Sequence, residues 1–152
     1  MDEYYRLSNF QLASYMLQDP YIRSQYGGVV AIDKLPDLVL KKPKIFIVNT
    51  DTSKEPGEHW FVIYVTDRCE YFDPAGLPAL PDAEIFMTKH SANYLANTER
   101  TQSYISYTCG LFCLFYAYFR CRNVSFKNIM NMFHENLHVN EAIVQHFYEL
   151  TK

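Results

Sequence analysis

The chain has 152 residues, of which 49% are hydrophobic and 16% aromatic, with thirteen Tyr and eleven Phe. This composition excludes a disordered chain and predicts a single packed domain over residues 1–152, of a size that folds without a disulfide framework. The formal net charge is −3, so no overall positive field attracts nucleic acid, although a local basic patch is left open.

The first residues, MDEYYRLSNF, are acidic where a secretion signal needs positive charge, so we expect no targeting peptide. The longest apolar stretch covers residues 110–119, about half the length of a membrane helix, and favours a buried core helix without a membrane partner. We therefore expect a protein of the cell interior that is not secreted. Its four cysteines then favour free thiols over a disulfide framework.

The first half of the chain predicts one helix followed by strands. A capping box between Ser8 and Gln11 starts the helix, and Asp19-Pro20 ends it. Residues 25–43 form a loop-rich passage with a Gly-Gly turn. Strands are then expected over residues 44–50, 59–66 and 69–74, the last two as an antiparallel hairpin.

The second half contains mainly helical patterns. Helical spacing over 83–95 precedes a short alternating strand at 101–108, and an apolar helix runs from Cys109 to about Arg122. Amphipathic helices follow at 125–133 and 140–150. We therefore predict an α+β fold in which a small, mainly antiparallel sheet packs around one central buried helix.

Residues 134–138, HENLH, match the His-Glu-x-x-His pattern of zinc proteases, in which one helical face carries both His ligands. Asn136 and Asn140 are instead typical of the end of one helix and the cap of the next, and a break there destroys the ligand spacing. The four-residue step from Cys109 to Cys113 is not that of a common zinc site either. We interpret HENLH as a helix–helix connection and predict no metal site.

The string TCGLFC places Cys109 in the first turn of the predicted buried helix. If Thr108 caps this helix, unpaired backbone N–H groups and the helix dipole stabilise a thiolate at Cys109. Gly110 has no side chain, which lets a substrate backbone approach and makes this glycine a candidate binding residue. Cys113 and Cys121 are expected to be core thiols, and the same reading stays open for Cys109.

A cysteine nucleophile needs a base and groups that orient the base and the substrate. His59 begins one predicted strand, Asp73 ends its partner strand, and Gln102 precedes Cys109 by seven residues. We expect Asp73 to accept from Nδ1–H of His59, and the Gln102 amide to donate to an oxyanion beside the Cys109 N–H. Each residue has an ordinary structural alternative, but together they predict a thiol hydrolase site.

The strings IVNT, GEHWFVIYV, CEYFDPAGLP and TQSYISYTCGLFC resemble the adenovirus endopeptidase (adenain) family of cysteine proteases. That family has His-Trp, an acidic residue before Pro, Thr-Gln-Ser and Cys-Gly-Leu-Phe-Cys in this order. The similarity covers roughly residues 20 to 120 and extends to adenain-like proteases of viruses and of Polinton/Maverick-type elements, within the ubiquitin-like-protein protease superfamily. It implies a papain-like or adenain-like fold.

The resemblance also implies roles for individual residues. Cys109 is the expected nucleophile, His59 the base, Asp73 the group that orients the base, and Gln102 an oxyanion donor. Trp60, the one tryptophan, is expected beside the catalytic histidine and is a candidate for substrate binding. The acidic residue of the family is often Glu, so an Asp here is one methylene shorter.

By the same resemblance, the protein is expected to be a monomeric cysteine endopeptidase that cleaves viral capsid and core precursors at Gly-containing sites. Its expected location is the virion and the host nucleus or cytoplasm. The adenovirus enzyme uses a disulfide-linked peptide and DNA as activators. No cysteine lies between Cys69 and Cys109 and the net charge is negative, so we expect no cofactor. A ubiquitin-like isopeptidase and a catalytically silent interaction module remain alternatives.

Overall fold

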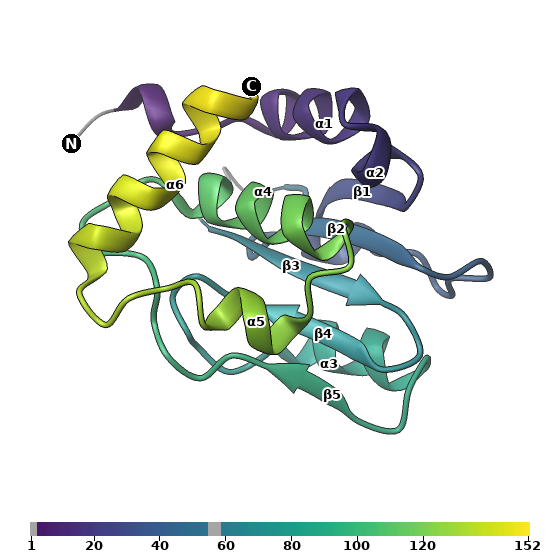
Figure 1. Ribbon diagram of the computed structural model, residues 1–152. Coiled ribbons are helices and arrows are strands. Elements are labelled where there is room, and N and C mark those ends of the chain that lie inside the picture. The colour runs from purple at the N-terminus through teal and green to yellow at the C-terminus, as the bar shows by residue number, and fades with distance from the viewer. Residues whose placement is uncertain (1–2, 55–58) are drawn as a thin grey trace.

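The computed structural model describes residues 3–54 and 59–152 and shows one five-stranded sheet with helices on both faces (Figure 1). The strands, in their spatial order, are β1 (Tyr26–Ala31), β2 (Lys44–Asn49), β3 (Trp60–Val65), β4 (Cys69–Phe72) and β5 (Tyr94–Ala96). The helices are η1 (Glu3–Tyr5), α1 (Asn9–Gln18), α2 (Pro20–Arg23), η2 (Ile32–Lys34), α3 (Pro81–Thr88), α4 (Cys109–Arg120), α5 (Phe126–Met130) and α6 (Leu137–Thr151).

The sheet combines antiparallel and parallel pairing. At its centre, β2 pairs with β3 and β3 with β4 in antiparallel fashion, which includes the predicted hairpin. At the two edges, β1 runs parallel to β2 and β5 runs parallel to β4. The predicted α+β class is therefore confirmed, and the sheet is mixed, with its antiparallel part in the middle.

The helix α4 lies at the centre of the molecule, as the apolar run of the sequence predicts. All nine residues from Cys109 to Ala117 are buried. The helix packs on β3 and is enclosed by α1, α2, α5 and α6 (Figure 1). In the ranges that the structure describes, no helix has both the length and the apolar character needed to cross a membrane.

Two cores form because helices cover both faces of the sheet. On one face, α4 and its neighbouring helices pack against β2, β3 and β4, and Phe72 stacks on Tyr116 with ring centroids 5.0 Å apart. On the other face, α3 places Phe86 and Met87 against the sheet. Strands covered on both faces need no polar side, which explains why β3 is apolar throughout and β2 is polar only at its two end residues.

Two predictions about local structure are wrong. The passage predicted as loop-rich contains the edge strand β1, where Gly27 makes no turn. A Cβ atom at Gly27 would lie 2.6 Å from the Phe46 ring, so this glycine serves close packing within the sheet. Residues 101–108 form no strand. The backbone N–H groups of Thr101 and Gln102 donate to the carbonyl oxygen of Pro74, which lies in a turn, and not to a neighbouring strand.

One helix boundary differs from the sequence pattern, and another confirms it. The helical spacing over 83–95 ends early, because α3 stops at Thr88 and the last part of this range forms β5. The capping box of α1 is present: the Ser8 hydroxyl accepts the Gln11 N–H at 3.1 Å, and the Gln11 side chain accepts the Ser8 N–H at 2.8 Å. The N-terminal helix therefore begins where the sequence predicts.

Gly76 is the glycine whose replacement we expect to cost most. Its φ of +69° lies in the left-handed region, and an added Cβ would lie 2.6 Å from backbone atoms of Glu99 and Arg100. We therefore expect Gly76→Ala to lower the free energy of unfolding by about 2 kcal/mol or more, and Tm by about 5 °C. Leu77→Ala, at the adjacent exposed position, is the control and is expected to change Tm little. Equal Tm values for the two variants, measured by thermal denaturation, would contradict this.

Candidate active site

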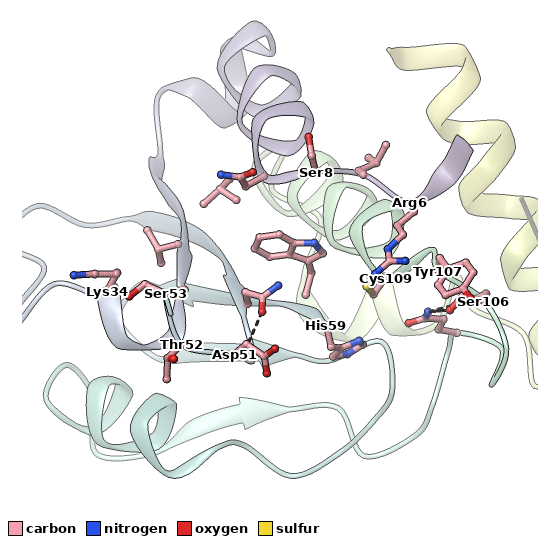
Figure 2. A pocket seen from close by; sticks show the side chains of 18 residues that line it. Arg6, Ser8, Lys34, Asp51, Thr52, Ser53, His59, Ser106, Tyr107 and Cys109 are labelled. Carbon is pink, nitrogen blue, oxygen red and sulfur yellow. Dashed lines mark hydrogen bonds between the residues drawn. The ribbon is translucent and has the colours of Figure 1, made fainter. Parts of the chain in front are cut away.

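A cleft of about 730 Å³ opens where the N-terminal segment, β1, the start of β3 and the loop before α4 meet. Figure 2 shows that Cys109 and His59 face this cleft from different elements, with Arg6 and Tyr107 nearby. Trp60 and Gln102 also line it, so four of the six predicted site residues share one cavity. Of the other two, Asp73 is 3% exposed and lies behind His59, and Gly110 is described below.

Cys109 is the first residue of α4 and is a free cysteine, 7% exposed. The helix therefore directs its unpaired N–H groups and the positive end of its dipole toward the cleft. Thr108 occupies the cap position, but its side chain accepts no N–H of the helix. Thr108 is thus the N-cap residue, as supposed from the sequence, and its hydroxyl donates to Glu141 of α6 at 2.7 Å.

His59 and Asp73 form a short, buried contact. The distance from His59 Nε2 to Asp73 Oδ1 is 2.6 Å. The prediction that Nδ1 makes this bond is wrong, because the ring presents Nε2 to Asp73. Nδ1 is then the ring nitrogen left for Cys109.

The environment of His59 favours the protonated ring. Burial on its own lowers the pKa of His59, but hydrogen bonds to Asp73 and Cys109 and the charges of both groups outweigh it and raise this pKa to about 9. The structure therefore favours an imidazolium next to Cys109 at neutral pH, which is the counterion that a reactive thiolate requires.

Asp73 is held by a residue that the sequence analysis missed. Its backbone N–H donates to Asn97 Oδ1 at 2.8 Å, and Asn97 Nδ2 donates back to the Asp73 carbonyl at 2.7 Å. The Ala75 N–H donates to Asp73 Oδ1 at 2.8 Å, to the same oxygen that contacts His59. No local pattern marks Asn97 as a partner, because it lies 24 residues away along the chain.

Gln102 reaches the cleft, but its amide is engaged with a neighbour. Gln102 Nε2 donates to the Ser106 carbonyl at 3.1 Å and to Ser106 Oγ at 3.0 Å. Its Oε1 is buried and has no hydrogen-bond partner in the part of the chain that the structure describes. The predicted oxyanion donor is therefore close to Cys109, and one of its N–H groups would have to turn from Ser106 to reach a substrate oxygen.

Gly110 does not line the cleft, which corrects its expected role in substrate binding. An added Cβ would lie 3.2 Å from Leu12 and 3.5 Å from Leu7, so the missing side chain lets α1 and the segment before it pack closely on α4. Cys113 and Cys121 are buried in the core as expected. Burial raises the pKa of the Cys113 thiol well above its ordinary value and that of Cys121 to about 12.

The HENLH string is a helix–helix connection, as predicted. Asn136 caps α6 by accepting the His138 N–H at 3.0 Å, so His138 lies in that helix. His134 precedes the cap, and its backbone N–H donates to Asn140 Oδ1 at 2.6 Å. The two histidines are therefore not one turn apart on a single helix. Over residues 3–54 and 59–152, no group of three or more His, Cys, Asp or Glu side chains is arranged to hold a metal ion.

Comparison with known proteins connects this geometry to viral cysteine proteases. A cysteine protease of African swine fever virus is 31% identical over 99 residues, which span 56% of this chain and 36% of the relative. The crystal structure of the selenomethionine form of the pS273R protease of that virus matches 72% of this chain and 47% of its own, with 25% identity and a TM-score of 0.50. No family model matches the chain.

A second crystal structure of the pS273R protease matches 81% of this chain and 60% of its own, with a TM-score of 0.51 and 20% identity. The chain thus spans between about one third and three fifths of the length of these relatives. The comparisons show that it has the α+β fold of a viral cysteine protease and is related in sequence to one. They do not extend to the roles of individual site residues, which stay predictions.

The contact between His59 and Asp73 can be tested by titration. In the wild-type protein we expect the His59 ring to titrate with a pKa of about 9, followed by NMR of its ring protons. Because Asp73 raises this pKa, Asp73→Asn should lower it toward the ordinary histidine value of 6.5. Asp82→Asn changes an exposed carboxylate of α3 and should leave the titration unchanged. A His59 pKa that is the same in both variants would contradict the assigned contact.

Proposed function

We propose that this chain is a cysteine endopeptidase that cleaves viral capsid and core precursor proteins at Gly-containing sites. The observation that carries the proposal is the cleft in which Cys109, at the start of α4, faces a histidine whose other ring nitrogen contacts a buried aspartate. The sequence relation to a cysteine protease of African swine fever virus supports the reaction class and the viral context.

In the proposed acylation step, the Cys109 thiolate attacks the carbonyl carbon of the scissile bond and forms a C–S bond. The carbonyl electron pair moves to oxygen, and the backbone N–H of Cys109 and one N–H of Gln102 stabilise the charge. When the C–N bond breaks, His59 Nδ1 gives its proton to the leaving amine. The products are a thioester that joins Cys109 to the upstream part of the substrate, and the downstream part of the substrate, which leaves with a free N-terminal amine.

In the proposed deacylation step, a water molecule gives a proton to His59 Nδ1 and attacks the thioester carbonyl. The C–S bond breaks and returns its electron pair to the Cys109 sulfur, the product leaves as a carboxylic acid that loses its proton to solvent, and the Cys109 thiolate again faces a protonated His59. Asp73 keeps the ring in the orientation that presents Nδ1 throughout, since its Oδ1 contacts Nε2. The cycle needs no metal and no further cofactor.

The shape of the cleft supports glycine at the cleaved bond. Trp60 and Tyr107 line the cleft together with Cys109, so two bulky aromatic side chains share this cavity with the reacting sulfur. A glycine lets a substrate backbone pass between such side chains with the least steric conflict.

We propose that the protein is located in the virion and in the host nucleus or cytoplasm. We also propose that it acts on protein substrates as a monomer, with residues 1–152 forming a single domain.

Cleavage assays test the proposed function directly. The wild-type protein should cleave a capsid-precursor peptide that contains Gly-Gly, and Cys109→Ala should lose activity by about 10⁴-fold or more, measured by mass spectrometry. Cys113→Ala removes a buried core thiol and should keep the chemistry if the protein folds. Iodoacetamide should abolish cleavage and a chelator should not.

Three results would contradict the proposal. Activity that persists in Cys109→Ala, or that a chelator and not a thiol reagent abolishes, would exclude a cysteine mechanism. Much faster turnover of folded ubiquitin-like fusions than of any capsid peptide would favour an isopeptidase. Alkylation of Cys109 by iodoacetamide near neutral pH at the rate of an ordinary thiol would favour a silent interaction module.

The pH dependence of cleavage follows from the raised pKa of His59. Since a protonated His59 is the proton donor to the leaving amine, kcat/KM should hold through pH 8 and fall above about pH 9. Circular dichroism at each pH serves as the control for unfolding. A fall of kcat/KM that begins near pH 6.5 would contradict this, because it would show that Asp73 and Cys109 do not raise the pKa of His59.

A further inference from the structure

Glu141 is a buried carboxylate outside the proposed catalytic set. It lies in the first part of α6 and is 9% exposed. No ion pair joins it to a cation within residues 3–54 and 59–152. A buried charge without a counterion is costly, so the groups that satisfy it are informative about its role.

The three donors to Glu141 all come from the loop that ends at the nucleophile. The Ser103 N–H donates to Oε2 at 2.9 Å, the Ser106 hydroxyl donates to Oε2 at 3.0 Å, and the Thr108 hydroxyl donates to Oε1 at 2.7 Å. One side chain of α6 therefore fixes the beginning, middle and end of this loop. Hydrogen bonds to a charged acceptor are about twice as strong as neutral ones, so the loop is held firmly.

The hydrogen bond between Ser106 and Glu141 also affects the Gln102 amide. Ser106 has one hydroxyl proton, and the carboxylate of Glu141 is the strongest acceptor within its reach. With that proton directed to Glu141, lone pairs of Ser106 Oγ remain to accept from Gln102 Nε2 at 3.0 Å. Glu141 thus orients the amide through Ser106.

The neighbouring residue of α6 acts on the start of the same segment. Asn140 is fully buried, and its Nδ2 donates to the Thr101 carbonyl at 3.0 Å. Farther along α6, Val144 and Phe147 supply the apolar contacts that pack the helix into the core. A carboxylate is not needed for that packing, and the polar contacts of Glu141 are confined to the loop between Gln102 and Cys109.

We propose that Glu141 is a positioning residue for the oxyanion site. It holds residues 103–108 and, through Ser106, one N–H of the Gln102 amide, so that the second N–H of this amide can turn with the Cys109 N–H toward the carbonyl oxygen of the substrate. This inference rests on the proposed function, because an oxyanion forms only if Cys109 attacks a carbonyl. Glu141 touches neither the substrate nor the reacting atoms in this account.

The test compares Glu141→Gln and Glu141→Asp with Glu149→Gln, an exposed glutamate of the same helix. Glutamine keeps the size of the side chain but replaces one acceptor oxygen by a donor, so it cannot receive all three bonds. We expect Glu141→Gln to lower kcat by about 10- to 100-fold with KM changed less than about threefold. Glu141→Asp keeps the charge and should recover part of kcat.

Two further measurements separate positioning from general stability. Alkylation of Cys109 by iodoacetamide creates no oxyanion, so its rate in Glu141→Gln should stay within about threefold of wild type. Amide hydrogen exchange over residues 103–108 should be faster in Glu141→Gln than in Glu149→Gln.

The outcomes distinguish the two proposals. If wild type cleaves peptides and Glu141→Gln matches Glu149→Gln in kcat and exchange, the inference alone is overturned. Equal losses of cleavage and alkylation in Glu141→Gln, with a lowered Tm, would show a purely structural role and also overturn it. If wild type shows no thiol-dependent turnover of any peptide, the proposed function fails, and the role of Glu141 fails with it.

Discussion

The carbonyl oxygen of Pro74 joins the two halves of the site, and the remaining geometry depends on this junction. It accepts the backbone N–H groups of Thr101 at 2.9 Å and Gln102 at 3.1 Å. The turn that carries Asp73 is thereby fixed to the segment that carries Gln102. Gly76 makes the approach possible, since a side chain there would collide with the backbone of that segment. The carboxylate proposed to orient the base and the proposed oxyanion donor are therefore set relative to each other by backbone contacts.

The nucleophile is fixed by a different means, the burial of α4. Its residues from Cys109 to Ala117 are packed between the sheet and the surrounding helices, so the helix cannot shift along its axis without opening the core. Cys109 is therefore held in the cleft at the start of α4, and Cys113 lies one helical turn deeper, in the core. The cleft therefore depends on two kinds of interaction: the hydrogen bonds to the Pro74 carbonyl and the apolar packing of α4.

Features set by neighbouring residues could be predicted from the sequence, and features set by distant partners could not. The capping box at Ser8, the hairpin of β3 and β4, and α4 all follow from local patterns. The edge strand β1 was missed because glycines used for packing against another strand are indistinguishable from turn glycines. The alternating loop at 101–108 was misassigned because its hydrogen-bond partners, Pro74 and Glu141, lie far away in the chain.

The same distinction explains the site. Four residues could be assigned to one site from their order and a family resemblance, but the ring nitrogen that contacts Asp73 depends on how the segments at β3 and β4 place the two side chains. A reactive thiolate at Cys109 needs a counterion beside it. His59, with its pKa raised to about 9 between Asp73 and Cys109, is the group positioned to supply it.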